Sequence, residues 1–187
     1  MIFADDVASQ PWRNGGGQSR ELLAWPSSEQ CDLRVALADI DKDGPFSTYD
    51  GVERWIVVIS GVGIELGFSD RARRLLLGDE PLQFDGGDAP GCRLVDGPTR
   101  DLNMMVHGGR GVMRSVDAGV VWNEEFAVRG VFTAAAGTWS CHGETRRMPA
   151  MALLWLDGDA AGNWKFEYEE ATSLPHAWWL GFTPSGD

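Results

Sequence analysis

Short apolar runs separated by glycine, aspartate and proline recur along the whole chain. Residues 34–40 form one such run, and it ends at a turn cluster over residues 41–45. Residues 55–59 are apolar at every position and predict a strand buried on both faces, whereas residues 64–68 alternate as a half-buried strand does. Further runs occupy residues 75–77, 81–84, 92–95, 102–107, 131–135, 152–156, 164–169 and 177–182. Many short strands joined by tight turns predict an all-β sandwich or barrel.

Helical signals are weak, and a faint internal repeat is visible. Short helical turns are expected at most around residues 70–74 and 123–125. Residues 55–61 resemble residues 152–158, and the same offset places residues 34–39 on another apolar strand, residues 131–136. Chance similarity between apolar strands would produce the same pattern. A true repeat would mean two tightly fused β modules, which we place at residues 1–110 and 111–187.

Charge and cysteine usage exclude several classes of protein. The formal net charge is -12, with 16 Lys+Arg against 28 Asp+Glu, and a nucleic-acid partner needs a basic footprint instead. No apolar stretch is long enough to span a membrane, and the first residues lack the layout of a signal peptide. The cysteines, Cys31, Cys92 and Cys141, are odd in number and widely spaced, as free thiols in a reducing compartment are. We therefore expect a cytoplasmic protein without a membrane partner.

Three stretches of the chain carry a family resemblance. Residues 11–22 read PWRNGGGQSREL and resemble a PW-x-N-G-x-G-x-[ST]-R-E opening motif. Residues 43–47 read DGPFS and are followed at residues 51–54 by GVER, while residues 97–105 read GPTRDLNMM. In this order the motifs are similar to those of the HutD/Ves family, whose members are associated with histidine utilisation and stress annotations.

The resemblance implies a double cupin, two β-barrel or jelly-roll modules in one chain, and it also marks a departure from metal-bearing cupins. The usual first cupin motif carries an HxH pair and a glutamate as metal ligands. Here the corresponding residues 46–53 contain the acidic residue but no histidine, and His107, His142 and His176 each stand alone. A catalytic metal site needs clustered imidazoles or thiolates. We therefore predict neither a metal nor another cofactor.

The most unusual local sequence is the run from Trp12 through Arg13, Asn14, Gly15 and Gly16. Successive glycines can bring backbone N–H groups close to an anion, and an arginine can add a fork for a carboxylate. The alternative is a purely structural loop closing a barrel end, with the tryptophan as a plug. The spacing is not that of a phosphate-binding P-loop.

Several arginines occupy positions that require a partner. Arg20 follows the glycine-rich run, and Arg34 lies inside an apolar strand, where an unpaired charge would be costly. Arg34 either faces the barrel lumen and meets an acid, or pairs with Asp32 or a nearby glutamate on an outer face. Glu53 and Arg54 are adjacent, so at most one of them enters a cavity, and a rim ion pair is the other interpretation.

A polar face is predicted on the strand over residues 102–107. Asp101, Asn103 and Met105 are two residues apart and share one face of that strand, with His107 after them. This set would suit the interior of a barrel that holds a polar ligand, although a solvated strand face gives the same pattern.

These observations favour a protein that binds a small carboxylate metabolite in the first module, with a regulatory role. Family association makes urocanate or formylglutamate candidate ligands. An enzyme is a less favoured alternative, acting on a small acid without metal through Asp101 or Glu53, and a scaffold without a small ligand is a second. Trp178 and Trp179 point to opposite faces of a strand, so one ring could be exposed at a homodimer contact.

Overall fold

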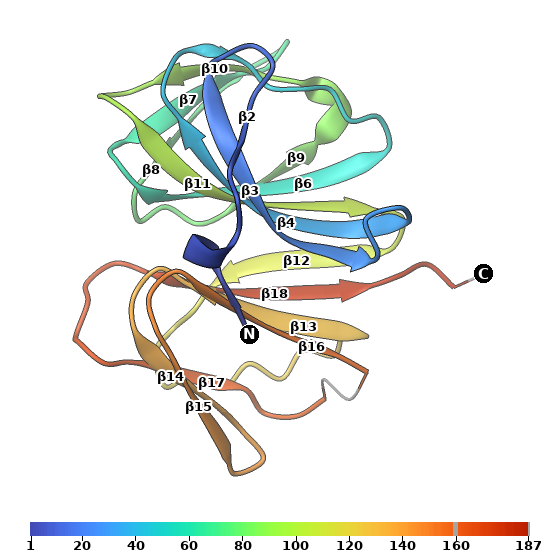
Figure 1. The fold of residues 1–187 in the computed structure, drawn as a ribbon, viewed down its shortest axis with the longest axis vertical. Coiled ribbons are helices and arrows are strands. Elements are labelled where there is room, and N and C mark those ends of the chain that lie inside the picture. The colour runs from blue at the N-terminus through green and yellow to red at the C-terminus, as the bar shows by residue number, and fades with distance from the viewer. Residues whose placement is uncertain (159–160, 187) are drawn as a thin grey trace. The chain divides into compact units, whose positions relative to one another are not determined.

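The computed structural model describes residues 1–158 and 161–186 and is built almost entirely of strands (Figure 1). None of the helices in these residues is long and apolar enough to cross a membrane. Contacts divide the chain into two compact units, residues 7–108 and residues 1–6 together with 109–187. The boundary near residue 109 lies beside the one expected from the sequence, but the first six residues belong with the second unit.

The unit of residues 7–108 contains a six-stranded and a four-stranded sheet, with orders β2-β3-β4-β11-β6-β9 and β5-β10-β7-β8. All the pairings are antiparallel. Its elements are β2 (Gln10–Pro11), β3 (Gly17–Pro26), β4 (Cys31–Ile40), β5 (Gly44–Pro45), β6 (Val52–Ser60), β7 (Gly63–Gly67), β8 (Ala72–Leu76), β9 (Leu82–Asp85), the 3-10 helix η2 (Gly86–Asp88), β10 (Gly91–Leu94) and β11 (Thr99–His107).

The other unit contains a five-stranded and a three-stranded sheet, with orders β1-β16-β13-β18-β12 and β15-β14-β17. Its elements are β1 (Ile2–Phe3), the 3-10 helix η1 (Ala4–Asp6), β12 (Arg110–Ser115), β13 (Val128–Thr133), β14 (Gly137–Cys141), β15 (Glu144–Met148), β16 (Ala152–Asp157), β17 (Lys165–Tyr168) and β18 (Ala177–Thr183). The strand β1 pairs with β16, which explains why the first residues belong to this unit.

The all-β prediction is confirmed, with two local errors and several omissions. The proposed helical turn at residues 70–74 is wrong, because residues 72–76 form β8, paired along its length with β7. Asn123 to Glu125 form no helix either. The sequence pattern overlooked β3, β12 and the β14–β15 hairpin. Their side chains are only partly buried, so they lack the apolar runs that announced the other strands.

The two units share one topology, but not in the register that the sequence suggested. In the larger sheets, the order β4-β11-β6-β9 of the first unit corresponds to β12-β18-β13-β16 of the second. In the smaller sheets, β10-β7-β8 corresponds to β17-β14-β15. The sequence offset had matched β6 with β16, whereas the sheet orders match β6 with β13. The resemblance between residues 55–61 and 152–158 was therefore one apolar strand mistaken for another, although the chain does contain two modules.

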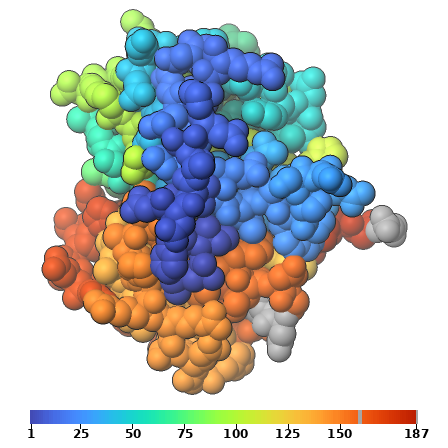
Figure 2. All heavy atoms as spheres, in the orientation of Figure 1, coloured from blue at the N-terminus to red at the C-terminus, as the bar shows by residue number. Residues whose placement is uncertain are grey.

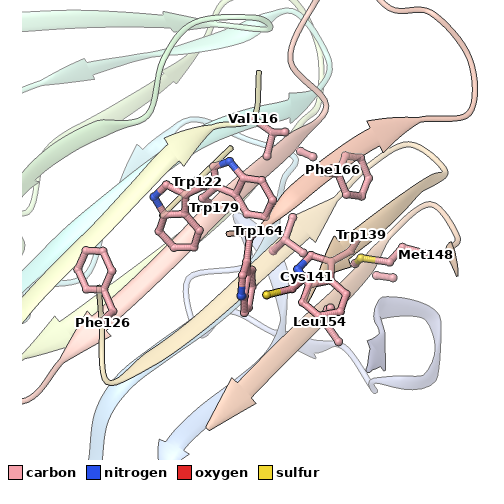
Figure 3. Close-up of a cluster of buried hydrophobic side chains, with 13 residues drawn as sticks. Val116, Trp122, Phe126, Trp139, Cys141, Met148, Leu154, Trp164, Phe166 and Trp179 are labelled. Carbon is pink, nitrogen blue, oxygen red and sulfur yellow. The ribbon is translucent and has the colours of Figure 1, made fainter. Parts of the chain in front are cut away.

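The core of the second unit is dominated by tryptophan rings. Trp122 stacks on Trp179 with ring centroids 5.2 Å apart, and Trp164 meets both edge-on (Figure 3). Trp178 lies on the opposite face of β18 and packs on Phe132. Both Trp178 and Trp179 are at most 4% exposed, so the expectation of an exposed ring at this pair is wrong.

Candidate functional site

A cavity of about 590 Å³ lies inside the module formed by residues 7–108. Its volume is typical of a pocket for a small ligand. One wall is the inner face of β3, β4, β11 and β6, and the other is formed by residues 10–14, residues 45–47 and Tyr49. The strands β2 and β3 of this module lie within the part of the chain that Figure 2 colours blue, together with residues 1–6 of the other unit.

Strand register aligns the inward side chains in three cross-strand rows. The first row contains Ser19, Ala38, Asp101 and Val58, and the second contains Glu21, Ala36, Asn103 and Ile56. The third row brings Arg34, Met105 and Arg54 together on β4, β11 and β6. Successive strand residues alternate between faces, so residues two apart line the same wall. The two alanines of β4 are small and leave the space open.

Arg54 is the principal charged group of the cavity, and its side chain is buried at 4% exposure. Its Nη2 donates to Oδ1 of Asn103 at 3.1 Å. Its guanidinium also lies 5.0–5.6 Å from the ring centroids of Phe46, Tyr49 and Phe84. The Nε and Nη1 atoms find no hydrogen-bond partner within residues 1–158 and 161–186. Burial lowers the pKa of Arg54, although nearby Asp101 opposes that change.

Asp101 lies at the end of the same network and is fully buried. Asn103 donates from Nδ2 to Oδ1 of Asp101, while Oδ2 of Asp101 has no partner in the described part of the chain. Burial raises the pKa of Asp101 to about 8, and the charge of Asp39 adds to the rise, while Arg54 and Asn103 oppose it. The carboxyl group is therefore mostly protonated at pH 7.

Arg34 contributes a second cation to the cavity wall. Its Nε lies 2.9 Å from Oε2 of Glu21, and both side chains remain more than one-third exposed. Arg34 therefore combines the two roles considered for it, since it lines the cavity and also pairs with a neighbouring glutamate, not with Asp32. An exposed ion pair of this kind is weak and can open for a ligand.

The glycine-rich loop lies beside the cavity, but its amides are not aimed at a ligand. Trp12, Arg13 and Asn14 line the cavity, whereas Gly15 and Gly16 do not. The Gly15 amide donates to the Trp12 carbonyl at 3.0 Å, and the Gly16 amide donates to Oδ1 of Asn14 at 2.9 Å. The prediction of an anion-binding nest at Gly15 and Gly16 is therefore wrong, because their N–H groups are already used within the loop.

The glycines of this loop have structural reasons instead. Gly15 has a φ of 67°, a left-handed conformation that glycine adopts without strain. Gly17 pairs with Ile40 at the start of β3, where a Cβ atom would overlap the carbonyl oxygen of Asp39. Gly17 therefore permits the close approach of β3 and β4.

Arg20 is the other predicted site residue that the structure removes from the cavity. It lies between the cavity-lining Ser19 and Glu21 and therefore points to the opposite face of β3. There its Nη1 bonds Oδ2 of Asp39 at 2.9 Å, and Asp39 also binds Arg100. These bonds lower the pKa of Asp39 despite its partial burial, which acts in the opposite direction.

Sequence reasoning missed the role of Arg54 and the aromatic side chains around it. Of the adjacent Glu53 and Arg54, only Arg54 lines the cavity, and Glu53 accepts a hydrogen bond from Gln83 instead. Within the part of the chain that the structure describes, Arg54 forms no rim ion pair of the kind proposed for it. No local signal could have singled out Arg54, because residues 55–59 are apolar at every position and both faces of β6 are buried.

The second module provides an internal comparison for Arg54. Arg54 pairs with Phe84 next to the end of β9, and Arg129 pairs with Leu156 next to the end of β16, so they are topological counterparts. Arg129 is also buried, 4.2 Å and 4.4 Å from the ring centroids of two tryptophans. However, it donates to the carbonyls of Gly162 and Trp122 at 2.8 Å and 2.6 Å. The guanidinium of Arg129 is therefore bound by backbone carbonyls, whereas the guanidinium of Arg54 lies in the wall of a cavity.

Metal-bearing cupins raise the question of whether this cavity fits a metal ion. The described residues that line it include no histidine or cysteine, and the two carboxylates among them are Glu21 and Asp101. Glu21 is paired with Arg34, and Asp101 is held largely protonated. A ligand for a divalent cation must be deprotonated, so these residues do not fit a cupin metal site. No metal-binding group of three His, Cys, Asp or Glu residues occurs in the part of the chain that the structure describes.

The fold and the cavity together define an all-β protein of two cupin-like modules, with an arginine-bearing cavity in the first of them. The chain belongs to the HutD family, whose model matches residues 4–174. It is 35% identical over 108 residues to an uncharacterised 21.2 kDa protein from the hutC 3′ region of Pseudomonas putida, and this match spans 56% of each chain. It is 26% identical over 157 residues to the protein Ves of Cronobacter sakazakii, covering 82% of this chain and 86% of that one.

Solved structures agree with this assignment. HutD from Pseudomonas fluorescens SBW25 superimposes with a TM-score of 0.85 at 27% identity, covering 99% of this chain and 98% of that chain. A mutant of Bacillus subtilis oxalate decarboxylase superimposes with a TM-score of 0.64 at 8% identity, covering 99% and 77%. The second likeness concerns the fold alone.

Proposed function

We propose that this protein binds a small carboxylate metabolite in the cavity of its first module and serves a regulatory role in histidine utilisation. The observation that carries the proposal is the buried guanidinium of Arg54, whose Nε and Nη1 lack hydrogen-bond partners in the described residues. A buried charge that is not fully paired lowers the stability of a protein, so its presence favours a functional role. A bound anion would satisfy both the charge and the free N–H groups.

The charge balance around Arg54 favours a carboxylate over a cation. Asp101 is mostly neutral at pH 7, so it leaves the positive charge of Arg54 largely uncompensated. Arg34 and Arg13 add further cationic groups to the cavity lining. An arginine matches the two oxygens of a carboxylate with parallel hydrogen bonds. The acidic background of the chain would repel anions elsewhere and leave this cavity as the favoured position.

The identity of the carboxylate is proposed from the family. One relative lies in the hutC 3′ region, and the solved HutD from P. fluorescens is described in a formate condition. Urocanate, N-formylglutamate and formate are therefore the acids to test first. The cavity of about 590 Å³ is large enough for each of them.

A metal-independent enzyme acting on a small acid is the second candidate, and it rests on Asp101. A carboxyl group with a pKa of about 8 in a cavity could transfer a proton at neutral pH. Glu53 is a poorer candidate for this reaction, because it does not line the cavity. Consumption of an acid that is lost in Asp101→Asn would favour the enzyme over the binding protein.

The proposal is tested by thermal unfolding with each of the three acids, with and without EDTA. A ligand at one hundred times its Kd should stabilise the folded protein by about 2.7 kcal/mol and raise the Tm accordingly. Arg34→Ala should weaken this stabilisation, because it removes a cation from the cavity wall. Arg20→Ala is the matched control, since Arg20 lies on the other face of the same sheet. No shift with any acid, or equal losses in the two variants, would contradict the proposal.

A further inference from the structure

We propose that Asp101 serves the site as a neutral carboxylic acid, donating a hydrogen bond from Oδ2 to the bound carboxylate, so that ligand binding is coupled to proton uptake. This inference rests on the proposed function, and it assigns the chemistry by which the site would select a carboxylate. It follows from the order of hydrogen bonds in the chain Arg54–Asn103–Asp101.

The orientation of Asn103 is fixed by its neighbour. A guanidinium can only donate hydrogen bonds, so the atom of Asn103 that faces Nη2 of Arg54 must be its carbonyl oxygen. The amide nitrogen therefore points the other way and donates to Oδ1 of Asp101. Oδ1 is thus occupied as an acceptor, and the proton of the neutral acid belongs on Oδ2. That atom is buried and has no partner among the residues described.

The partnerless buried atoms of Arg54 and Asp101 in the cavity lining are all donors when Asp101 is neutral. Nε and Nη1 of Arg54 are available, and Oδ2–H of Asp101 joins them. A carboxylate consists of acceptors only, so it brings no donor of its own that would need a partner beside these groups. A primary amide brings N–H donors that meet no free acceptor among these atoms, and a buried polar group without a partner is costly. The cavity should therefore discriminate a carboxylate from the amide of the same acid.

Other charged groups near Asp101 do not supply the same proton. On β6, Arg54 remains a cation, and on β4, Asp39 points to the opposite sheet face and has a lowered pKa. Cys92 on β10 faces the interior, and burial raises its pKa to about 12, with Asp101 adding to the rise. Tyr49 lies beside Arg54, on the loop before β6. Asp101 is the group near this network whose pKa of about 8 falls close to neutrality.

The pH dependence follows from linkage. Above the pKa of Asp101 in the free protein, binding must take up one proton, so the apparent Kd should rise about tenfold per pH unit. Below that pKa the Kd should be flat. With a pKa of about 8, the Kd at pH 9.5 should exceed that at pH 6.5 by more than about tenfold.

Acetate and acetamide are suitable probes, because they differ only in the group that meets Arg54 and Asp101. Binding is followed in the full-length protein between pH 6.5 and 9.5 by NMR titration, with sodium chloride at matched ionic strength as the reference. We expect millimolar binding of acetate with the stated pH dependence and at least tenfold weaker binding of acetamide at pH 6.5. In Asp101→Asn the affinity for acetate should fall by less than about tenfold and lose its dependence on pH. In the control Asp39→Asn the pH dependence should remain.

The carboxyl ¹³C resonance of Asp101 in the free protein gives a second measurement that needs no ligand. It should titrate above pH 7, and an ionised Asp101 at pH 6 would overturn the inference. A wild-type Kd for acetate that is independent of pH, or a pH dependence that persists in Asp101→Asn, would overturn it while leaving carboxylate binding intact. Absence of acetate binding at every pH, together with no response to the three acids of the panel, would remove the proposed function itself.

Discussion

Replacement of Arg54 by methionine separates ligand binding from stability at one position. Methionine is unbranched and adaptable and can occupy the space between the rings of Phe46, Tyr49 and Phe84. The variant removes the only buried cation that lines the cavity among the residues described. We therefore expect carboxylate binding to be lost while the fold is retained.

The expected loss of affinity can be worked from the free donors. Nε and Nη1 of Arg54 each offer one hydrogen bond to the anion, and a bond to a charged group contributes about 1.5–3 kcal/mol. Loss of both removes about 3–6 kcal/mol of binding free energy, which weakens the Kd by about 10²–10⁴. The cost to stability should be smaller, about 1.5 kcal/mol or less. The variant loses the hydrogen bond to Asn103, but the free-energy cost of burying the charge of Arg54 is also removed, and this offsets the loss.

Affinity is measured by isothermal titration with the acid that gives the largest thermal shift, and stability by urea denaturation at pH 7. Arg129→Met is the matched variant, because Arg129 is the topological counterpart with two carbonyl partners. It should lower the free energy of unfolding by about 3 kcal/mol or more and leave the affinity for the carboxylate unchanged. Retention of binding within threefold in Arg54→Met would refute the reasoning. So would a loss of stability equal to that of Arg129→Met, since Arg54 would then be structural.

Three further outcomes are expected from urea denaturation of single variants. Gly17→Ala should lower the free energy of unfolding by about 1–3 kcal/mol, because the added Cβ would overlap the Asp39 carbonyl oxygen. In the control Gly16→Ala the added Cβ meets only the Asn14 side chain, so the loss should be smaller, and equal losses would contradict this explanation. Asp101 has a raised pKa, so the stability that it contributes at low pH should decline as pH rises from about 4 to about 8. The ligand-free Asp101→Asn variant should not show this decline, and it should be more stable than the wild-type protein at pH 8. Asp39 has a lowered pKa, so its contribution to the free energy of unfolding should be present above its unfolded-state pKa and disappear as pH falls through its folded-state pKa. An Asp39→Asn variant whose stability falls at acidic pH just as that of the wild-type protein does would contradict the ion-pair assignment.

Local sequence was sufficient for the class of fold and for part of the cavity wall. Apolar runs ended by Gly, Asp and Pro predicted most of the strands, because strand period and turn preference are properties of neighbouring residues. The same two-residue period placed Asp101, Asn103 and Met105 on one face, and all three line the cavity. The family motifs could also be read without any three-dimensional information.

Tertiary structure alone decided which of the candidate polar groups meet. A sequence gives the parity of a strand but not which face is inside, so Arg20 was placed in the site and Arg54 was not. The glycine-rich loop looked ready for an anion because its internal partners, the Trp12 carbonyl and the Asn14 side chain, become visible only once the loop is closed. The raised pKa of Asp101 likewise depends on burial by strands far along the chain. Each of these features arises from pairing between distant segments, and residue order alone does not encode the choice of partner in any local pattern.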